Sequence, residues 1–245
     1  MTKQSLPKIF AAIYALLLCA NISQAQVTEV EPNNTPQQAN TLPFGGYGNG
    51  ALNIAGDIDW WKVTTNVDGK LYITLDNTGN PDSKRLSLYD TAGTILLASG
   101  GIGNGIGGIS MDGLATGTFF IKINGSSGNE TGAYKLSDSL VPSPKPNDIE
   151  PNDNITHAKR LLLNDSTTGH LGYYYNNHRD TSDWYKVTTT SDGMLELTFD
   201  NTYQNDIKTI LLYDTTGSPQ LASANVGNGI GGLQFDGLAA GTYYI

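Results

Sequence analysis

The sequence has almost no cysteine, since Cys19 is the only one among 245 residues. Cys19 lies in a leader where Lys3 and Lys8 precede the apolar run 9–20, with small residues at positions 23 and 25. This order is typical of a secretory signal peptide at residues 1–25, with cleavage before Gln26. The secreted chain then has no disulfide, no thiol nucleophile and no thiolate metal site, so we expect it to rely on its core and on bound cations.

Long apolar runs and basic residues are also scarce. The run 9–20 is shorter than the about 20 apolar residues that a membrane span needs, so we expect no membrane insertion after signal cleavage. Removing the two lysines of the leader changes the balance of 14 basic and 23 acidic residues to 12 and 23, a net charge of −11. Such an acidic chain disfavours nucleic acid and anionic membranes as partners, and it offers many hard oxygen ligands.

Recognisable catalytic motifs are missing: the sequence contains neither H-E-x-x-H nor G-x-S-x-G. Residues 103–108 and 227–232 fit G-x-G-x-x-G, but strand-like sequence follows them where a dinucleotide site needs a helix. A hydrolase that acts through paired aspartates is one further hypothesis, beside a non-catalytic module and an adhesion module. Most repeated acids stand in turns such as Asp68-Gly69, which turn geometry explains. We therefore expect no enzyme activity in this chain and read His157, His170 and His178 as exposed loop residues.

The sequence does contain a long internal repeat. Residues 59–65, Asp-Trp-Trp-Lys-Val-Thr-Thr, return as 183–189, and this spacing of 124 holds to the last residue. Residues 31–34, Glu-Pro-Asn-Asn, return as 150–153, a spacing of 119, so the second copy has five extra residues within 171–179. This pattern predicts two tandem units, the first unit at 26–140 and the second unit at 148–245. The proline-rich linker 141–147 is predicted to be stiff, extended and outside any sheet.

Within each unit the apolar residues alternate with a period of two, which is typical of strands. Short strands separated by Gly, Asn and Asp predict an all-β fold of two antiparallel, jelly-roll-like β-sandwiches, with one short turn near 36–41. The alternation points Trp61 and Val63 into the core and leaves Trp60 and Trp184 facing outward. The second copy stops at the counterpart of residue 121, so we expect it to lack its last strand and the sequence to be the amino-terminal part of a longer protein.

Acids and amides gather at the start of each unit and again just before each aromatic pair. Calcium takes six to eight oxygen ligands from carboxylates, amides and carbonyls, and an acidic opening closing onto a second acidic loop supplies them. A solvated acidic linker with turn-forming residues explains the pattern equally well. The candidate ligands are Asp148, Glu150, Asn152, Asp153, Asp180 and Asp183 in the second unit, and Glu29, Glu31, Asn33, Asn34, Asp57 and Asp59 in the first unit.

Four motifs together resemble the bacterial pre-peptidase C-terminal domain: Glu-Pro-Asn-Asn at 31–34, Asp-Trp-Trp-Lys-Val at 59–63, Leu-Tyr-Asp-Thr-x-Gly at 88–93 and Gly-Leu-x-x-Gly-Thr-Phe-Phe-Ile at 113–121. The resemblance covers residues 29–137 and 148–245. It implies non-catalytic β-sandwich modules attached to secreted peptidases and other extracellular proteins. Related collagen-binding domains bind calcium through the acidic opening and an acidic pair, which implies the candidate ligands above except Asp57. The first unit departs from the pattern, because Gly56 stands where the second unit has Asp180.

These observations predict a secreted, non-catalytic pair of modules, outside a bacterium or on its surface, with calcium as the stabilising ion. The pair is expected to stabilise, space or target downstream domains of the same polypeptide, such as a peptidase or another hydrolase. The alternative is an adhesion module that binds an extracellular protein, glycan or matrix. Its binding surface would be a platform of exposed aromatic residues, namely Trp60, Trp184, Tyr173, Tyr174 and Tyr175.

Overall fold

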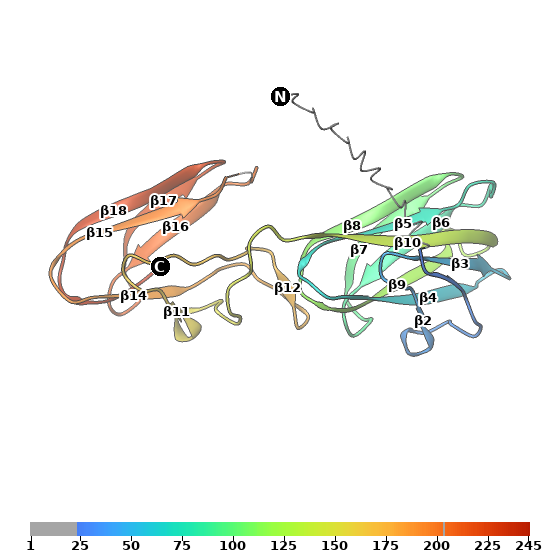
Figure 1. The fold of residues 1–245 in the computed structure, drawn as a ribbon, viewed down its shortest axis with the longest axis horizontal. Helices are drawn as coiled ribbons and strands as arrows, with labels where there is room; N and C mark the ends of the chain where they lie inside the picture. Colours follow the sequence, from blue (N-terminus) through green and yellow to red (C-terminus); the bar gives the residue numbers. More distant parts are fainter. Residues whose placement is uncertain (1–23, 203) are drawn as a thin grey trace, which may run out of the picture.

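The protein is built almost entirely of β-strands, as the period-two alternation predicts (Figure 1). The computed structural model describes residues 24–202 and 204–245. Helical structure in these ranges is confined to two 3-10 turns, η1 (Pro36–Gln38) and η2 (Ile155–His157). Within the described ranges, no helix is long and apolar enough to cross a membrane. The predicted signal peptide lies almost wholly in residues 1–23, outside what the structure describes.

The first unit consists of two sheets, with strand orders β1-β3-β10-β5-β8 and β2-β4-β9-β6-β7. Neighbouring strands are antiparallel except β1 with β3 and β2 with β4, which run parallel. The all-β prediction is therefore confirmed, with these two parallel pairs as a difference. The strands are β1 (Gln26–Thr28), β2 (Asn40–Thr41), β3 (Tyr47–Leu52), β4 (Ile58–Thr65), β5 (Gly69–Asp76), β6 (Lys84–Tyr89), β7 (Leu96–Ile102), β8 (Ile106–Leu114), β9 (Gly117–Gly125) and β10 (Gly132–Pro142).

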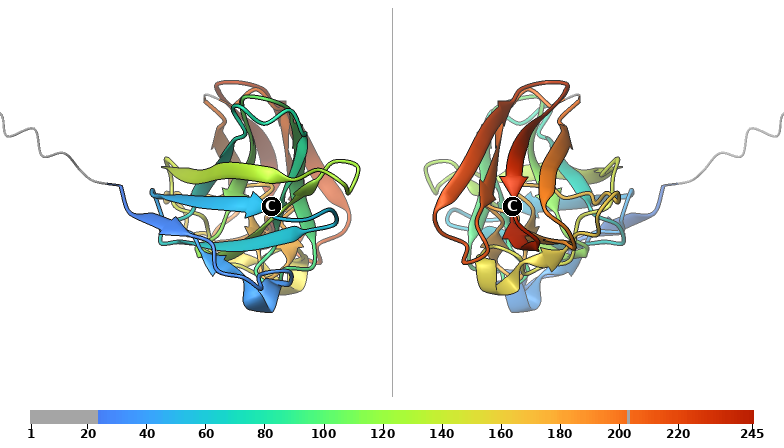
Figure 2. Two further views of the ribbon diagram at one scale, coloured as in Figure 1. Left: turned by 90° about the vertical axis from the view of Figure 1, so that its right-hand side faces the viewer. Right: turned by 90° about the vertical axis from the view of Figure 1, so that its left-hand side faces the viewer.

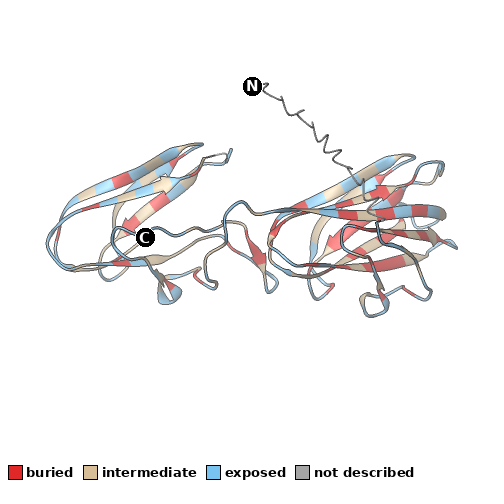
Figure 3. Cartoon of the chain, in the orientation of Figure 1, coloured by how far each residue is buried: buried red, intermediate tan, exposed pale blue. Residues whose placement is uncertain are grey.

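The core of the first unit lies between its two sheets. Every second residue of β4 and β5 points into it, as expected for strands with one buried face. Trp61 and Val63 on β4, and Leu71, Ile73 and Leu75 on β5, are at most 1% exposed. Burying each aliphatic side chain contributes about 1.5–3 kcal/mol to folding. Figure 3 shows buried segments along the strands of this unit.

The second unit repeats part of this arrangement around a smaller core. Its sheet β11-β14-β19-β16-β17 has the same order as β2-β4-β9-β6-β7, and β15 pairs with β18 as β5 does with β8. The right-hand view of Figure 2 has the second unit facing the viewer. Val187, Leu212 and Tyr243 are among its buried residues. Its strands are β11 (Lys159–Arg160), β14 (Tyr185–Thr189), β15 (Gly193–Asp200), β16 (Lys208–Tyr213), β17 (Gln220–Val226), β18 (Ile230–Leu238) and β19 (Gly241–Tyr244).

The linker prediction is wrong at its amino-terminal end. β10 continues through Val141 and Pro142, which pair with Lys70 and Gly69 of β5. Proline is accepted here because β3 pairs with β10 only as far as Ser137, so the end of β10 has one neighbour and its missing N–H breaks no ladder. The stretch outside the sheets therefore begins at Ser143.

A two-strand hairpin joins the two units. β12 (Tyr174–Tyr175) and β13 (His178–Arg179) pair antiparallel, and β12 runs parallel to the end of β8 in the first unit. Figure 1 shows β12 between the two sets of sheets. We call residues 174–179 the docking hairpin. It lies within 171–179, where the second copy has its five extra residues.

Candidate metal centre

The second unit brings three of its predicted acids to one point, as the coordination of a hard cation requires. Asp148 and Glu150 come from the opening segment, and Asp183 directly precedes the aromatic pair before β14. One carboxylate oxygen from each lies within 4.8 Å of the other two. A calcium ion with ligands at about 2.3–2.6 Å spans such a group. Together with Asn152 and Asp180, these residues form what we call the second acidic cluster.

Five side-chain oxygens around this point are buried and have no hydrogen-bond partner. Asn152 and Asp180 are 0% and 1% exposed, so water does not reach their free oxygens. Buried polar atoms are nearly always hydrogen-bonded, and leaving one unpaired costs about 1–3 kcal/mol. Several unpaired acceptors around one point fit a cation, which supplies no donor but satisfies them all. The oxygens are Asn147 Oδ1, Asp148 Oδ1, Asn152 Oδ1, Asp180 Oδ2 and Asp183 Oδ1.

The raised pKa values of the carboxyls in the second acidic cluster also favour a bound cation. Burial first, and then the charges of Asp148, Asp180 and Glu150, raise the pKa of Asp183 to about 8. Burial and neighbouring acids also raise the pKa of Asp180 and of Glu150. Without a positive charge, these carboxyls therefore hold protons at a pH where carboxylates are normally charged. A divalent cation removes that penalty by compensating the carboxylates directly.

A glycine lets the chain approach the second acidic cluster. A Cβ on Gly169 would lie 2.9 Å from Asp183 Oδ2, 3.2 Å from Asp148 Oδ1 and 3.2 Å from the hydroxyl of Tyr185. Gly50 is the counterpart of Gly169 at the same 119 spacing, and a Cβ there would meet Glu29 and Tyr134. Sequence reasoning missed both glycines, although the shared spacing was a signal that could have identified them.

The first unit gathers Glu29, Glu31 and Asp59 within the same 4.8 Å limit, but none of their oxygens is both buried and unpartnered. In the second acidic cluster one oxygen of Asp148 also accepts from the Tyr185 hydroxyl and the Asn152 amide group, and its other oxygen has no partner. The Tyr134 hydroxyl on β10 donates to Asp59 Oδ2 at 2.6 Å and lies 3.3 Å from Glu29 Oε2. The amide of Ala51 donates to Glu29 Oε1 at 2.6 Å. We call Glu29, Glu31, Asn33 and Asp59 the first acidic cluster. Its carboxylates are held by donors of the chain itself.

Asn33 completes the first acidic cluster in one of two orientations. With its NH2 toward the acids it donates to Asp59 Oδ1 at 3.2 Å and to Glu31 Oε2 at 3.0 Å, and its oxygen accepts from Asn40 at 3.0 Å. In the reverse orientation the amide oxygen joins the carboxylate oxygens, as a cation ligand does. Burial, together with nearby acids, raises the pKa of Asp59 to about 8 even though the Tyr134 hydrogen bond lowers it.

Three predicted ligands lie outside the groups of converging oxygens. Asn34 is exposed. Asp57 closes its own loop by accepting from the amides of Asn53 at 2.6 Å and Ile58 at 3.0 Å. Asp153 faces the docking hairpin, with His178 Nε2 at 3.2 Å from its Oδ1. These three residues therefore contribute no oxygen to the converging groups.

The predicted aromatic platform is wrong for three of its five residues. Trp60, Tyr173 and Tyr174 are 7%, 8% and 5% exposed. The alternation placed Trp60 on the outer face of β4 correctly. The opening segment covers it there, since the Trp60 amide donates to Asn33 O at 2.9 Å and its ring packs 5.0 Å from that of Tyr89. Trp184, stacked at 5.1 Å on Tyr213, and Tyr175 are half-buried.

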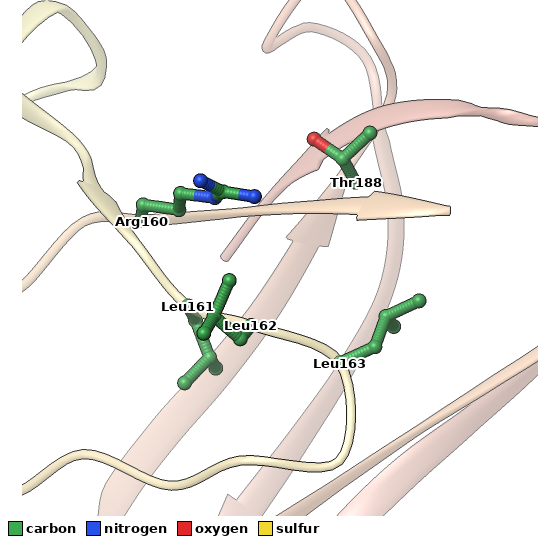
Figure 4. Close-up of a pocket in the computed structure, with 5 residues that line it drawn as sticks. All are labelled: Arg160, Leu161, Leu162, Leu163 and Thr188. Carbon is green, nitrogen blue, oxygen red and sulfur yellow. The ribbon is translucent and has the colours of Figure 1, made fainter. Parts of the chain in front are cut away.

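A pocket of about 350 Å³ lies beside β11 and β14, away from the acidic clusters. Figure 4 shows Arg160 and Thr188 at its rim, with three leucines along the chain below them. No carboxylate lines it, so it offers nothing to a hard cation. Its lining residues are Arg160, Leu161, Leu162, Leu163 and Thr188.

Comparison with known proteins finds similarity at the level of solved structures. No protein-family model and no curated protein matches the chain. The pre-peptidase C-terminal domain of collagenase from Bacillus anthracis is similar with a TM-score of 0.37 and 18% identity, over 44% of this chain and 100% of that domain. The PBSX exported protein XepA is similar with a TM-score of 0.31 and 9% identity, over 80% of this chain and 77% of that protein.

Proposed function

We propose that the chain is a secreted, non-catalytic pair of β-sandwich modules of the pre-peptidase C-terminal kind, and that its second unit binds calcium. The pair stabilises, spaces or targets further domains of the same extracellular polypeptide, such as a peptidase. The observation that carries the calcium site is the set of buried, unpartnered oxygens around Asp183. The leader at residues 1–25 supports secretion.

The ion would be held by oxygens of the second acidic cluster alone. Asp148, Glu150, Asp180 and Asp183 supply carboxylates and Asn152 supplies an amide oxygen, a donor set without nitrogen or sulfur that suits calcium. Bound there, the ion would offset the mutual repulsion of the buried acids. It would also tie the opening segment to the loop before β14, which keeps the second unit closed where its own core is small.

The test is thermal unfolding of the secreted chain, beginning at Gln26, in calcium and in chelator at pH 8. At a calcium concentration 100 times Kd, we expect the second unit to gain about 2.7 kcal/mol. That gain corresponds to a rise in Tm of roughly 10 °C or more for a domain of this size. Magnesium should give less, because it demands a tighter octahedral shell and releases its water reluctantly.

Asp183→Asn separates a metal site from general charge effects. It removes one of the opposed carboxylates, so the variant should unfold at a higher temperature than wild type in chelator and gain nothing from calcium. Glu196→Gln is the matched control, because it removes one exposed charge of β15 outside the cluster and should respond like wild type. Equal melting curves for wild type in calcium and chelator would refute the calcium site.

A further inference from the structure

The docking hairpin is a part of the second unit that is buried in the first. The side chain of Tyr174 is 5% exposed and belongs to the hydrophobic core of the first unit. Its carbonyl accepts from the amide of Ala115 at 3.0 Å, which extends the β8 edge by one strand. The first unit has no counterpart of the five extra residues, so folding a single sandwich does not require them.

Further contacts fix the hairpin on the first unit. Arg179 Nη2 lies 3.4 Å from the sulfur of Met111, and the hydroxyl of Thr91 lies 3.4 Å from Asn177 Oδ1. Gly113 allows the close approach: a Cβ there would lie 3.1 Å from Gly172 O. Its counterpart Gly237 has a similar positive φ, 76° against 68°, but open space around it.

The same segment forms one wall of the second acidic cluster. The residue after β13 is Asp180, whose amide donates to Tyr173 O at 2.8 Å and whose carbonyl accepts from Gly172 at 2.9 Å. Asp180 is 1% exposed and its Oδ2 has no partner, although Asp148 and Asp183 are close enough to interact with it. One short loop therefore carries both a cluster oxygen and the docking surface.

A second brace runs from the hairpin tip to the opening segment. Asp153 Oδ1 lies 3.2 Å from His178 Nε2, and Asp153 Oδ2 accepts from the hydroxyl of Tyr175 at 3.4 Å. Asp153 directly follows Asn152, whose Oδ1 is another of the buried, unpartnered oxygens. The hairpin is thus joined to the second acidic cluster twice, directly through Asp180 and indirectly through Asp153, the neighbour of Asn152.

We propose that the docking hairpin is a cation-dependent clasp, in which a divalent cation in the second acidic cluster fixes the second unit on the first. The inference rests on the proposed calcium site. The ion would hold Asp180 and Asn152 in place. The docking hairpin, which directly precedes Asp180, would then keep the conformation in which it packs on Gly113 and the edge of β8. Without the ion, repulsion among the acids loosens the hairpin, and the two units reorient about the residues after β10.

Thermodynamic linkage makes the clasp measurable from both sides. If calcium strengthens docking by some factor, docking must strengthen calcium binding by the same factor. Couplings between two sites in proteins typically amount to about 5–150-fold. A variant that blocks docking should therefore weaken calcium binding by about 5-fold or more, although it changes no ligand.

The first measurement is the distance distribution between spin labels on the two units. The secreted chain has no cysteine, so Ser99→Cys on β7 and its counterpart Ser223→Cys on β17, both exposed, give one label per unit. We expect a broad distribution in chelator and a narrow one in calcium. Calcium binding is followed in parallel by calorimetry on the same chain.

Gly113→Asn blocks docking, and Gly237→Asn is its matched control. Asparagine tolerates positive φ better than most residues, so both variants carry a similar backbone cost, but only position 113 faces the hairpin. Gly113→Asn should keep the distribution broad in calcium and raise the Kd about 5-fold or more. Gly237→Asn should behave as wild type in both measurements.

A double variant, Tyr175→Phe with His178→Gln, keeps Tyr174 in place and cuts the brace to Asp153. It should still bind calcium, with an affinity reduced by less than in Gly113→Asn, and calcium should narrow the distances less than in wild type. If wild type binds calcium but shows the same distribution with and without it, the clasp is wrong and the calcium site stands. If calorimetry detects no calcium binding that Asp183→Asn removes, the proposed site fails, and the clasp fails with it.

Discussion

At the scale of single residues, the two acidic clusters differ more in the hydrogen-bond partners of their carboxylates than in which residues they contain. Asp59 receives a hydrogen bond from Tyr134, whereas Asp183, its counterpart, keeps an oxygen buried and unpaired. A protein donor and a cation are two ways to satisfy the same carboxylate, and each makes the other less necessary. The second unit is therefore where a cation is expected to bind most tightly.

Gly169→Ala tests the close approach of the backbone to the second acidic cluster. The added methyl would lie 2.9 Å from Asp183 Oδ2, so we expect calcium affinity to fall about 10-fold or more as the carboxylates are displaced. Gly193→Ala is the control, since nothing lies within 4 Å of its Cβ position. Calorimetric titration measures both, and an unchanged Kd in Gly169→Ala would contradict the geometry of the cluster.

Asp138 on β10 predicts a pH dependence that is independent of calcium. Burial raises its pKa from 3.8 to about 6, and its one hydrogen bond, from the amide of Gly45 at 2.8 Å, only partly offsets this. Between pH 4 and 6 the folded state binds more protons at Asp138 than the unfolded state does. Stability contributed by this group is therefore present below pH 4 and lost as the pH rises through 6.

Asp138→Asn should remove that loss, because the amide stays neutral and its oxygen still accepts from Gly45. In chelator, the variant should match wild type near pH 4 and exceed it at pH 8 by on the order of 1–3 kcal/mol. Chemical denaturation at the two pH values measures the difference. A variant that is less stable than wild type at pH 8 would show that Asp138 is held charged by the fold.

At the scale of elements, the sequence predicts the strands, but it does not predict which segments pack over their outer faces. The period-two alternation of β4 and β5 gives the buried face directly, because a strand presents alternate residues to one side. It carries no information on what lies over the other face, so the burial of Trp60 under the opening segment was missed. The extension of β10 to Pro142 was missed because proline is accepted where a strand has one neighbour.

The candidate ligands were also predictable in part. Repeated acids with nearby amides identified Asp148, Glu150 and Asp183, since the 119 and 124 spacings recur around them. The contribution of Tyr134 depends on β10 crossing beside the first acidic cluster, a long-range contact that no local pattern encodes. The docking hairpin was read only as extra loop sequence because its partner lies in the other unit.

Tyr134→Phe tests what β10 contributes to the first unit. The Tyr134 oxygen donates to Asp59 and accepts from Trp61 Nε1 at 2.9 Å, so removing it leaves two buried groups unpaired. We expect a loss of about 1–3 kcal/mol in chelator. Tyr47→Phe, which removes an exposed hydrogen bond to Gln26, should cost less than 0.5 kcal/mol, on the order of a surface substitution. Equal losses in the two variants would contradict the account of the first acidic cluster.

At the scale of the whole molecule, two cores of unequal extent share one chain that is strongly acidic. The first unit has a large core of buried hydrophobic side chains, whereas the second unit has a smaller one (Figure 3). A cation bound in the second acidic cluster, as proposed, would therefore stabilise the unit with the smaller core. Through the docking hairpin, the same ion would also set how the two units are presented to any domain that follows.

The central claim is that the second unit holds one calcium ion, and calorimetric titration of the chain from Gln26 onward tests it most directly. We expect one tightly bound ion per chain at pH 8, lost in Asp183→Asn and kept in Asp59→Asn. That pattern assigns the ion to the second acidic cluster, because Asp59 and Asp183 occupy equivalent positions in the repeat. No detectable binding, or binding that Asp183→Asn leaves unchanged, would contradict the claim.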